Sequence, residues 1–218
     1  ALEIAKQQGW IIRNPFNQGD ALISIACEQK RERILTKEEE TSLLEACLGA
    51  RSHLRPILIC ALDTGMRQGE IFKLRWRDVN FYSKLITVEA LNTKTLKQRE
   101  IAMTRRLERE LLTLYQSSFA SLDSLVFGIE TNCKKAFNTL RNQVGLKDVR
   151  FHDLRHTAAT RMIQAGIPLP EVGRILGHTQ ANTTYRYVNA NADTARRVAM
   201  ALDSFHLEKE KDSMEQIN

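Results

Sequence analysis

Residues 152–166 read HDLRHTAATRMIQAG, a cluster of polar side chains that leads into a helix-forming stretch ending at a glycine. The pattern predicts a helix over 153–165, with Asp153 as its N-cap and the glycine just after its last turn. His152 and Arg155 would then be neighbours, because side chains three residues apart share a helix face. Free backbone N–H groups at a helix N-terminus attract anions. The stretch therefore predicts a helix whose first turn could hold a phosphate.

Helices and one small hairpin account for the rest of the pattern. Thr36 and Glu39 have the spacing of a capping box, which predicts a helix start. Two short alternating segments predict an antiparallel hairpin over 84–89 and 98–103. Apolar periodicity predicts further helices over 53–64, 104–118, 131–144, 170–176 and 182–202, with a short one beginning near Arg67. We therefore expect a mainly α fold with a small antiparallel β-sheet, an α+β class.

The length of 218 residues allows one substantial core and part of a second unit. Turn signals at Asn14-Pro15 and Gln18-Gly19 predict a linker. We expect 1–34 to be the end of an upstream domain with its linker, 35–205 to form one domain and 206–218 to be a tail. Because the first residue is Ala1 in a helix-like stretch, we also expect the chain to be cut from a longer protein.

Composition argues against several classes of protein. Hydrophobic residues make up 43% and charged residues 27%, close to globular averages, which argues against disorder and collagen. No apolar run approaches the roughly 20 residues of a membrane span, so we expect no membrane insertion. The cysteines form no CxxC pair, which favours small apolar residues in a reducing compartment over disulfides or a cysteine metal site. These cysteines are Cys27, Cys47, Cys60 and Cys133.

The positive charge is concentrated in one part of the chain. The whole sequence carries a formal charge of +6, but residues 51–200 hold 24 basic side chains against 13 acidic ones, a net +11. Such a concentration is typical of a phosphate-binding surface, although a solvated basic face has the same count.

Three readings of the histidines compete. His152 and His156 lie four residues apart, a spacing that can seat zinc on a helix, but no glutamate stands between them and no cysteine is near. His156 would point about 100° away from Arg155, which favours a core histidine or a support for the site. On the third reading His152 and Arg155 are merely a satisfied histidine and a surface arginine at a cap.

The order of four short motifs carries a resemblance. Residues 64–70 read TGMRQGE, in which Glu70 could orient the Arg67 guanidinium or form a helix ion pair. HDLRH follows at 152–156, then Leu176-Gly177-His178, and a tyrosine nine residues after that histidine. In this order, the motifs resemble the signature of the tyrosine recombinases, the phage-integrase family, over roughly residues 35–202. The resemblance implies the fold of their catalytic domain for 35–205, preceded by the end of a core-binding domain.

The resemblance also implies a role for each motif residue. Guanidinium groups bind phosphate oxygens bidentately, and a lysine can protonate a leaving oxygen. The family's nine-residue step favours Tyr187 over Tyr185 as the nucleophile, and Tyr185 is expected to pack or to support the substrate. Lys97 competes with the hairpin lysine because it lies only three residues away. The implied site consists of the phosphate-binding Arg67 and Arg155, the histidines His152 and His178, the general acid Lys94 and the nucleophile Tyr187.

The implied activity is site-specific DNA recombination through a 3′-phosphotyrosyl intermediate, which integrates or excises a mobile element. The implied partners are double-stranded DNA, three further copies of the chain in a tetramer, and accessory DNA-bending or directionality proteins, in a bacterial cytoplasm at the nucleoid. No metal, ATP or other cofactor is implied, because neither a Walker loop nor an Asp/Glu cluster is present. The alternatives are a type IB topoisomerase-like enzyme, a DNA-binding regulator without catalysis and a metal-dependent nuclease.

Two further groups stay open. Trp76, Phe81 and Tyr82 could stack on nucleotides, but are better interpreted as core and turn aromatics. A basic cluster near 105 could contact DNA phosphates or form an exposed helix face, and the sequence does not separate the two. It consists of Arg105, Arg106 and Arg109.

Overall fold

The computed structural model describes residues 7–9, 33–90, 98–118, 120–130, 132–178 and 184. The chain divides into two compact units, Ala1–Glu32 and Arg33–Asn218, and almost all of the described residues belong to the second. Apart from Thr184, the predicted helix over 182–202 lies outside the described residues, as do the hairpin loop, the tail and Cys27.

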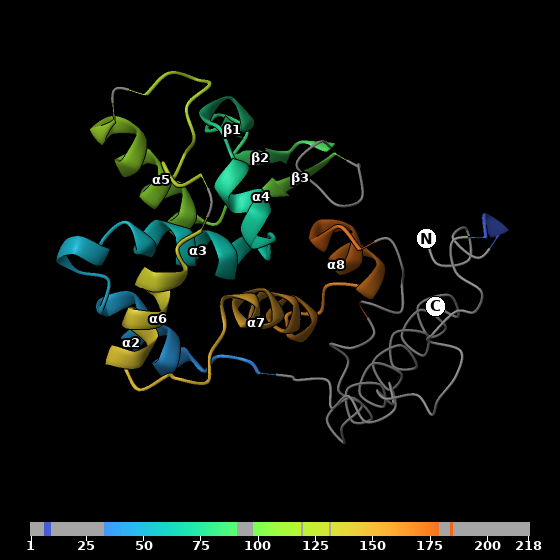
Figure 1. The fold of residues 1–218 in the computed structure, drawn as a ribbon. Helices are drawn as coiled ribbons and strands as arrows, with labels where there is room; N and C mark the ends of the chain where they lie inside the picture. Colours follow the sequence, from blue (N-terminus) through green and yellow to red (C-terminus); the bar gives the residue numbers. More distant parts are fainter. Residues whose placement is uncertain are drawn as a thin grey trace, which may run out of the picture. The chain divides into compact units, whose positions relative to one another are not determined.

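The second unit is mainly helical (Figure 1). In the described part of this unit, three short strands form one antiparallel sheet in the order β1-β2-β3, with Ile86 of β2 opposite Ile101 of β3. The α-helices are α2 (Lys37–Glu45), α3 (Leu54–Thr64), α4 (Gln68–Lys73), α5 (Arg105–Ser117), α6 (Lys134–Gln143), α7 (Phe151–Gln164) and α8 (Leu169–Leu176). The 3-10 helices are η3 (Gly49–Arg51) and η4 (Trp76–Asp78), and the strands are β1 (Val79–Asn80), β2 (Leu85–Val88) and β3 (Arg99–Ala102). The expected α+β class is confirmed.

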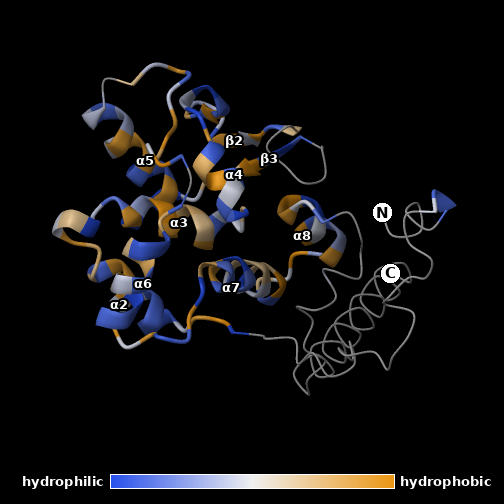
Figure 2. Ribbon diagram, viewed as in Figure 1, coloured by the Kyte–Doolittle hydropathy of each residue, from blue (hydrophilic) through white to orange (hydrophobic). Residues whose placement is uncertain are grey.

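Helix α3 is the centre of the core. Nearly all of its residues are buried, and it packs against α7 on one side and α5 on the other (Figure 1). Figure 2 shows α3 mostly in the hydrophobic colour, whereas α2 and α6 present large hydrophilic surfaces. Burying one Leu or Ile side chain contributes roughly 1.5–3 kcal/mol. Helix α3, which leads into the TGMRQGE motif, is thus packed between α5 and α7.

Two predicted helix starts need correction, and one strand was not predicted. The helix expected from 131 begins at Lys134 as α6. Helix α7 begins at Phe151, so Asp153 is not the N-cap but the third helical residue, and its Oδ2 accepts the Arg150 backbone N–H at 2.8 Å. A carboxylate at that position satisfies the cap residue's own N–H, as in the second half of a capping box. Strand β1 was not predicted, because two residues are too few to show an alternating pattern. The capping box of Thr36 and Glu39 is confirmed.

The described cysteines and aromatic rings pack as the sequence predicted. Burial raises the pKa of the Cys47 thiol to about 11 and of the Cys60 thiol to about 12, so both stay protonated and pack as small apolar groups. Cys133 is also buried and free. Trp76 is buried, with its ring centroid 4.9 Å from that of Tyr115, whereas Tyr82 is fully exposed in a turn.

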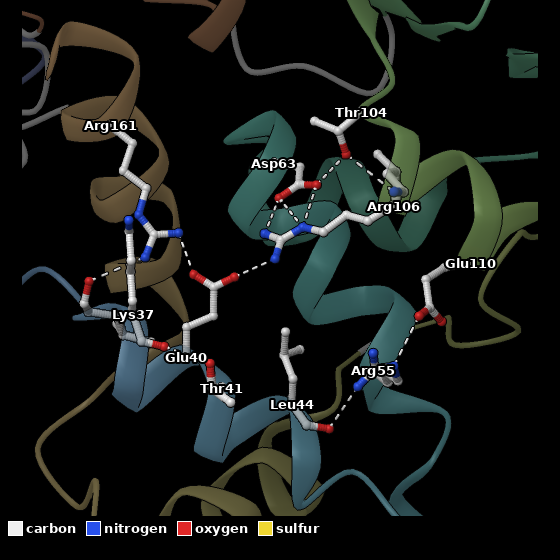
Figure 3. A network of polar contacts seen from close by, with 12 residues as sticks. Lys37, Glu40, Thr41, Leu44, Arg55, Asp63, Thr104, Arg106, Glu110 and Arg161 are labelled. Carbon is white, nitrogen blue, oxygen red and sulfur yellow. Dashed lines mark hydrogen bonds and ion pairs between the residues drawn. The ribbon is translucent and has the colours of Figure 1, made fainter. Parts of the chain in front are cut away.

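A polar network connects α2, α3, α5 and α7, with buried carboxylates and partly exposed arginines (Figure 3). Glu40 accepts hydrogen bonds from Arg106 Nη1 at 2.5 Å and from Arg161. Asp63 accepts two from Arg106 Nε, at 3.0 and 2.8 Å, and one from the Thr104 hydroxyl. The Arg106 side chain therefore pairs with carboxylates of the fold. For this residue, the structure answers the question that the sequence left open about the basic cluster near 105. Arg105 and Arg109 are exposed on α5.

Replacing Glu40 with Gln should lower the free energy of unfolding by about 1–3 kcal/mol. The change leaves two guanidinium groups without their shared carboxylate, and the partial exposure of Arg106 moderates a cost that reaches 3–5 kcal/mol for fully buried pairs. Urea unfolding measures the effect. Glu38→Gln is the matched control: it lies exposed on the same helix and should change the value by less than about 0.5 kcal/mol. Equal losses of unfolding free energy in the two variants would show that the network does not stabilise the fold.

Candidate active site

Three of the predicted site residues, Arg67, Arg155 and His178, meet at the end of α8. The helix ends in Gly177, whose φ of 68° lies in the left-handed region, and the His178 N–H donates to Gly173 O at 2.9 Å. The last carbonyl groups of a helix have no partners within the helix and carry the negative end of its dipole. At this helix end, the carbonyl oxygens of residues 175, 176 and 177 each accept a hydrogen bond from a different arginine.

Arg67 reaches this end from the turn between α3 and α4. Its Nη2 donates to Gly177 O at 3.0 Å, and its Nη1 donates to Glu70 Oε1 at 3.0 Å. The other oxygen of Glu70 accepts the Arg67 backbone N–H at 2.9 Å. Glu70 therefore both orients the guanidinium and forms an ion pair with it, the two roles that the sequence allowed. The side chain of Arg67 is 25% exposed, so one side of it faces solvent.

Arg155 reaches the same place from α7 and is almost completely buried, at 3% exposure. Its Nη1 donates to Gly65 O at 2.6 Å and its Nη2 to Leu176 O at 2.7 Å. Gly65 must be a glycine here, because its φ is +64° and a Cβ would lie 2.5 Å from Leu176 Cδ2. Arg155 thus ties the end of α3 to the end of α8 and is more than a surface arginine at a cap.

The two predicted histidines are close in the chain to residues of this contact. His178 follows Gly177 directly, and its Nδ1 shares a hydrogen bond of 2.9 Å with Oγ1 of the buried Thr184. His152 is exposed on the first turn of α7, three residues before Arg155. Its ring packs edge to face on that of His156, with centroids 4.7 Å apart. His156 therefore contacts His152 directly, in agreement with a supporting role.

A pocket of about 440 Å³ opens beside His152. Its lining combines amide and cationic side chains with two aromatic rings, a composition suited to a polyanion with planar groups. The lining residues are Gln68, Asn132, Lys134, Phe137, Asn138, Arg141, Arg150, Phe151 and His152. One lining residue, Gln68, follows Arg67 in the chain. The pocket is therefore close to the arginines at the end of α8 as well as to His152.

Arg99 is a third arginine at the end of α8, with a buried side chain, and the sequence analysis did not identify it. Its Nε donates to Ile175 O at 2.7 Å and its Nη2 to Glu70 Oε2 at 2.7 Å. Burial alone would raise the pKa of the Glu70 carboxyl, but hydrogen bonds and charge from Arg99, with help from Arg67, outweigh it and hold that pKa below its usual value. The sequence contained one signal for its burial, because in an alternating strand Arg99 shares its face with the buried Ile101.

The structure therefore brings four of the six predicted residues to one region, namely Arg67, His152, Arg155 and His178. Lys94, its rival Lys97, Tyr185 and Tyr187 lie outside the described residues. Within the described part of the chain, no three His, Cys, Asp or Glu side chains gather closely enough to hold a metal ion. In the same part, no helix is long and apolar enough to cross a membrane.

The chain belongs to the phage integrase family, because the model of that family matches residues 33–194. This confirms the resemblance drawn from the order of the motifs. One similar protein is a tyrosine recombinase XerC-like protein of Caldanaerobacter subterraneus, 26% identical over 83% of this chain and 56% of that protein. Another is a shufflon-specific DNA recombinase of Escherichia coli, 31% identical over 74% of this chain and 41% of that protein. The integrase of Salmonella phage P22 is 25% identical over 81% of this chain and 49% of that protein.

The solved structures agree on the fold. The catalytic domain of bacteriophage HP1 integrase matches with a TM-score of 0.57 and 25% identity over 71% of this chain and 85% of that chain. A complex of the Tn1549 transposon integrase with circular intermediate DNA matches with a TM-score of 0.72 and 20% identity, over 91% of this chain and 74% of that one. The chain spans about half the length of the curated relatives that it matches.

Proposed function

We propose that this chain is the catalytic part of a site-specific DNA recombinase that cuts and rejoins strands through a 3′-phosphotyrosyl link. The observation that carries the proposal is the convergence of Arg67, Arg155 and His178 at the end of α8, with His152 one turn from Arg155. Two guanidinium groups and two imidazoles in one region suit a phosphodiester, which gains negative charge in the transition state.

The reaction conserves bonds and protons. Tyr187 Oη attacks the phosphorus, the P–O5′ bond breaks, and Tyr187 becomes joined to the 3′-phosphate. A histidine of the site takes the phenol proton, and Lys94 donates a proton to the leaving 5′ oxygen. A free 5′-OH from the partner strand then attacks the phosphotyrosine and reverses these steps. The bond energy stays in the covalent link, so the exchange needs no ATP.

Arg67 and Arg155 stabilise the phosphoryl oxygens while this happens. A guanidinium has five N–H donors in a fixed fork, enough to bind helix carbonyls and a phosphate together. The carbonyl oxygens of Gly65, Leu176 and Gly177 hold both groups in place before DNA arrives. Pre-positioned charge of this kind costs no rearrangement at the moment of reaction.

The partner is double-stranded DNA at a specific recombination site, with the pocket beside His152 as part of the contact surface. The names of related proteins support this, since they include a shufflon-specific DNA recombinase and integrases solved in complex with DNA. We further propose a tetramer on two sites, accessory DNA-bending or directionality proteins and action at the nucleoid in the cytoplasm. Residues 1–34 end a core-binding domain with its linker, 35–205 form the catalytic domain, and 206–218 are a tail.

Covalent trapping tests the proposal. Incubation with a nicked DNA substrate whose cut fragment diffuses away should give a protein–DNA adduct, and it should do so in the presence of a chelator. Peptide mapping should place the DNA on Tyr187. Loss of all cleavage in chelator would support a metal-dependent nuclease instead, and relaxation of supercoiled DNA without site preference would support a topoisomerase. Binding of DNA without any adduct would support a regulator.

Replacing Lys134 or Arg150 with Ala should weaken DNA binding and lower the salt dependence of log Kd by about 0.9 for each DNA phosphate that the variant no longer neutralises. Both side chains are exposed at the pocket. Binding measured between 50 and 200 mM salt checks this. Arg109→Ala, exposed on α5 away from the pocket lining, is the control and should keep the slope unchanged. A slope that changes only in Arg109→Ala would instead place the DNA-binding surface on α5.

A further inference from the structure

We propose that Arg99 is a positioning residue for strand cleavage, which keeps the charge of Arg67 available to the phosphate by neutralising Glu70. The inference deepens the proposed function and rests on it. Arg99 acts through Glu70 and not on the substrate, because its Nη1 and Nη2 donate to that carboxylate and its Nε donates to Ile175 O.

The geometry is a forked ion pair inside the protein. Arg99 Nη2 lies 2.7 Å from Glu70 Oε2 and Nη1 lies 3.3 Å from Oε1. Oε1 also accepts from Arg67 Nη1 at 3.0 Å, so one carboxylate lies between two guanidinium groups. The side chain of Glu70 is 2% exposed, which leaves water little access to screen its charge.

The balance of charge gives Arg99 its effect. Two arginines and one glutamate carry a net charge of +1, and the more exposed Arg67 presents it to solvent. Without Arg99, the buried carboxylate has Arg67 as its remaining cationic partner in this group. The pair is then neutral, and Arg67 attracts a phosphate less strongly. Without Glu70, the two guanidinium groups repel each other.

Arg99 also ties the hairpin to the helix end. It is the first residue of β3, pairs with Val88 of β2, and donates from Nε to Ile175 O. Its guanidinium covers Gly177, where a Cβ would lie 3.0 Å from Nη1. The segment that contains Lys94 joins these two strands. A single buried side chain thus links the base of that segment, Arg67 and the residue before His178.

A charge-compensated double variant tests the proposal. Arg99→Met should reduce the single-turnover rate of adduct formation about 10²-fold while DNA affinity stays within about two-fold. Glu70→Gln added to Arg99→Met removes the uncompensated carboxylate and should restore at least about ten-fold of that loss. A double variant as slow as Arg99→Met, or slower, would overturn the proposal, because the uncompensated carboxylate of Glu70 would then not be the cause of the loss.

Modified DNA gives a second readout that a structural role would not move. On a substrate whose non-bridging phosphate oxygen is replaced by methyl, the phosphate is neutral and depends less on Arg67, so the defect of Arg99→Met should shrink at least about ten-fold. On a 5′-phosphorothiolate, whose leaving group needs no proton, the defect should persist. Rescue by the phosphorothiolate alone would mean that Arg99 acts through the lysine of the hairpin and would overturn the Arg67 route.

Controls separate this inference from the proposed function. Arg77→Met removes an exposed arginine paired with Asp123 and should cleave at the normal rate. Thermal melting of each variant shows that it is folded at the assay temperature. If the unmodified protein forms no adduct, the proposed function fails. If it forms one and Arg99→Met forms it equally fast, only the role of Arg99 fails.

Discussion

Tyr187→Phe should form no covalent adduct with DNA, a loss of at least about 10⁴-fold in the rate of strand cleavage. The change removes one hydroxyl oxygen and keeps the ring, so the proposed nucleophile disappears while the aromatic ring remains. DNA affinity should stay within about two-fold. Gel separation of adduct from free DNA on a nicked substrate measures the first quantity, and a mobility shift measures the second.

Tyr185→Phe is the matched control, because it removes the same atom two residues away in the sequence. Two residues correspond to about 200° on a helix, so the two side chains of a helical segment cannot both reach one phosphate. The control should form the adduct at a rate close to that of the unmodified protein. An adduct that persists in Tyr187→Phe and vanishes in Tyr185→Phe would reverse the assignment.

Arg155→Lys should lower the rate of adduct formation by about 10²–10³-fold, the loss typical of removing one group that stabilises transition-state charge. Lysine keeps the charge but is a point donor without the planar fork. It cannot span Gly65 O and Leu176 O, which Arg155 now reaches with separate nitrogens at 2.6 and 2.7 Å. Single-turnover cleavage at saturating DNA measures the effect on the chemical step.

The stability of this variant needs its own control, because Arg155 also joins α3 to α8. Arg161→Lys lies six residues further along α7 and contacts Glu40 in the network of Figure 3. It should lower the melting temperature by a few degrees and leave the cleavage rate per folded molecule nearly unchanged. If Arg155→Lys is folded and cleaves as fast as the unmodified protein, Arg155 serves the fold alone.

Local sequence was enough for most secondary structure. The Thr36 and Glu39 capping box, the apolar stripe of α3 and the alternating β2 and β3 depend on residues within one or two turns of each other, and all are present. The start of α7 was misplaced because an aspartate stabilises a helix both as N-cap and at the third position. Strand β1 is two residues long and carries no period to detect.

The candidate site was predictable only in part. Motif order singled out Arg67, Arg155 and His178, and the structure brings them to one helix end. Arg99 was missed because its partners are 29 and 76 residues away in the chain. No local pattern shows which carboxylate or carbonyl a buried arginine will find.

By itself, the sequence determined the helical class, the hairpin, the family and the types of side chain that the chemistry uses. Only the tertiary structure decided how the arginines are divided. Arg106 neutralises Glu40 and Asp63 within the fold, Arg99 neutralises Glu70, and Arg67 keeps a face toward solvent. The physical reason is that helix periods and caps act over a few residues. Which buried charges pair depends instead on the packing of distant elements, because a charge removed from water must find its partner wherever the fold places it.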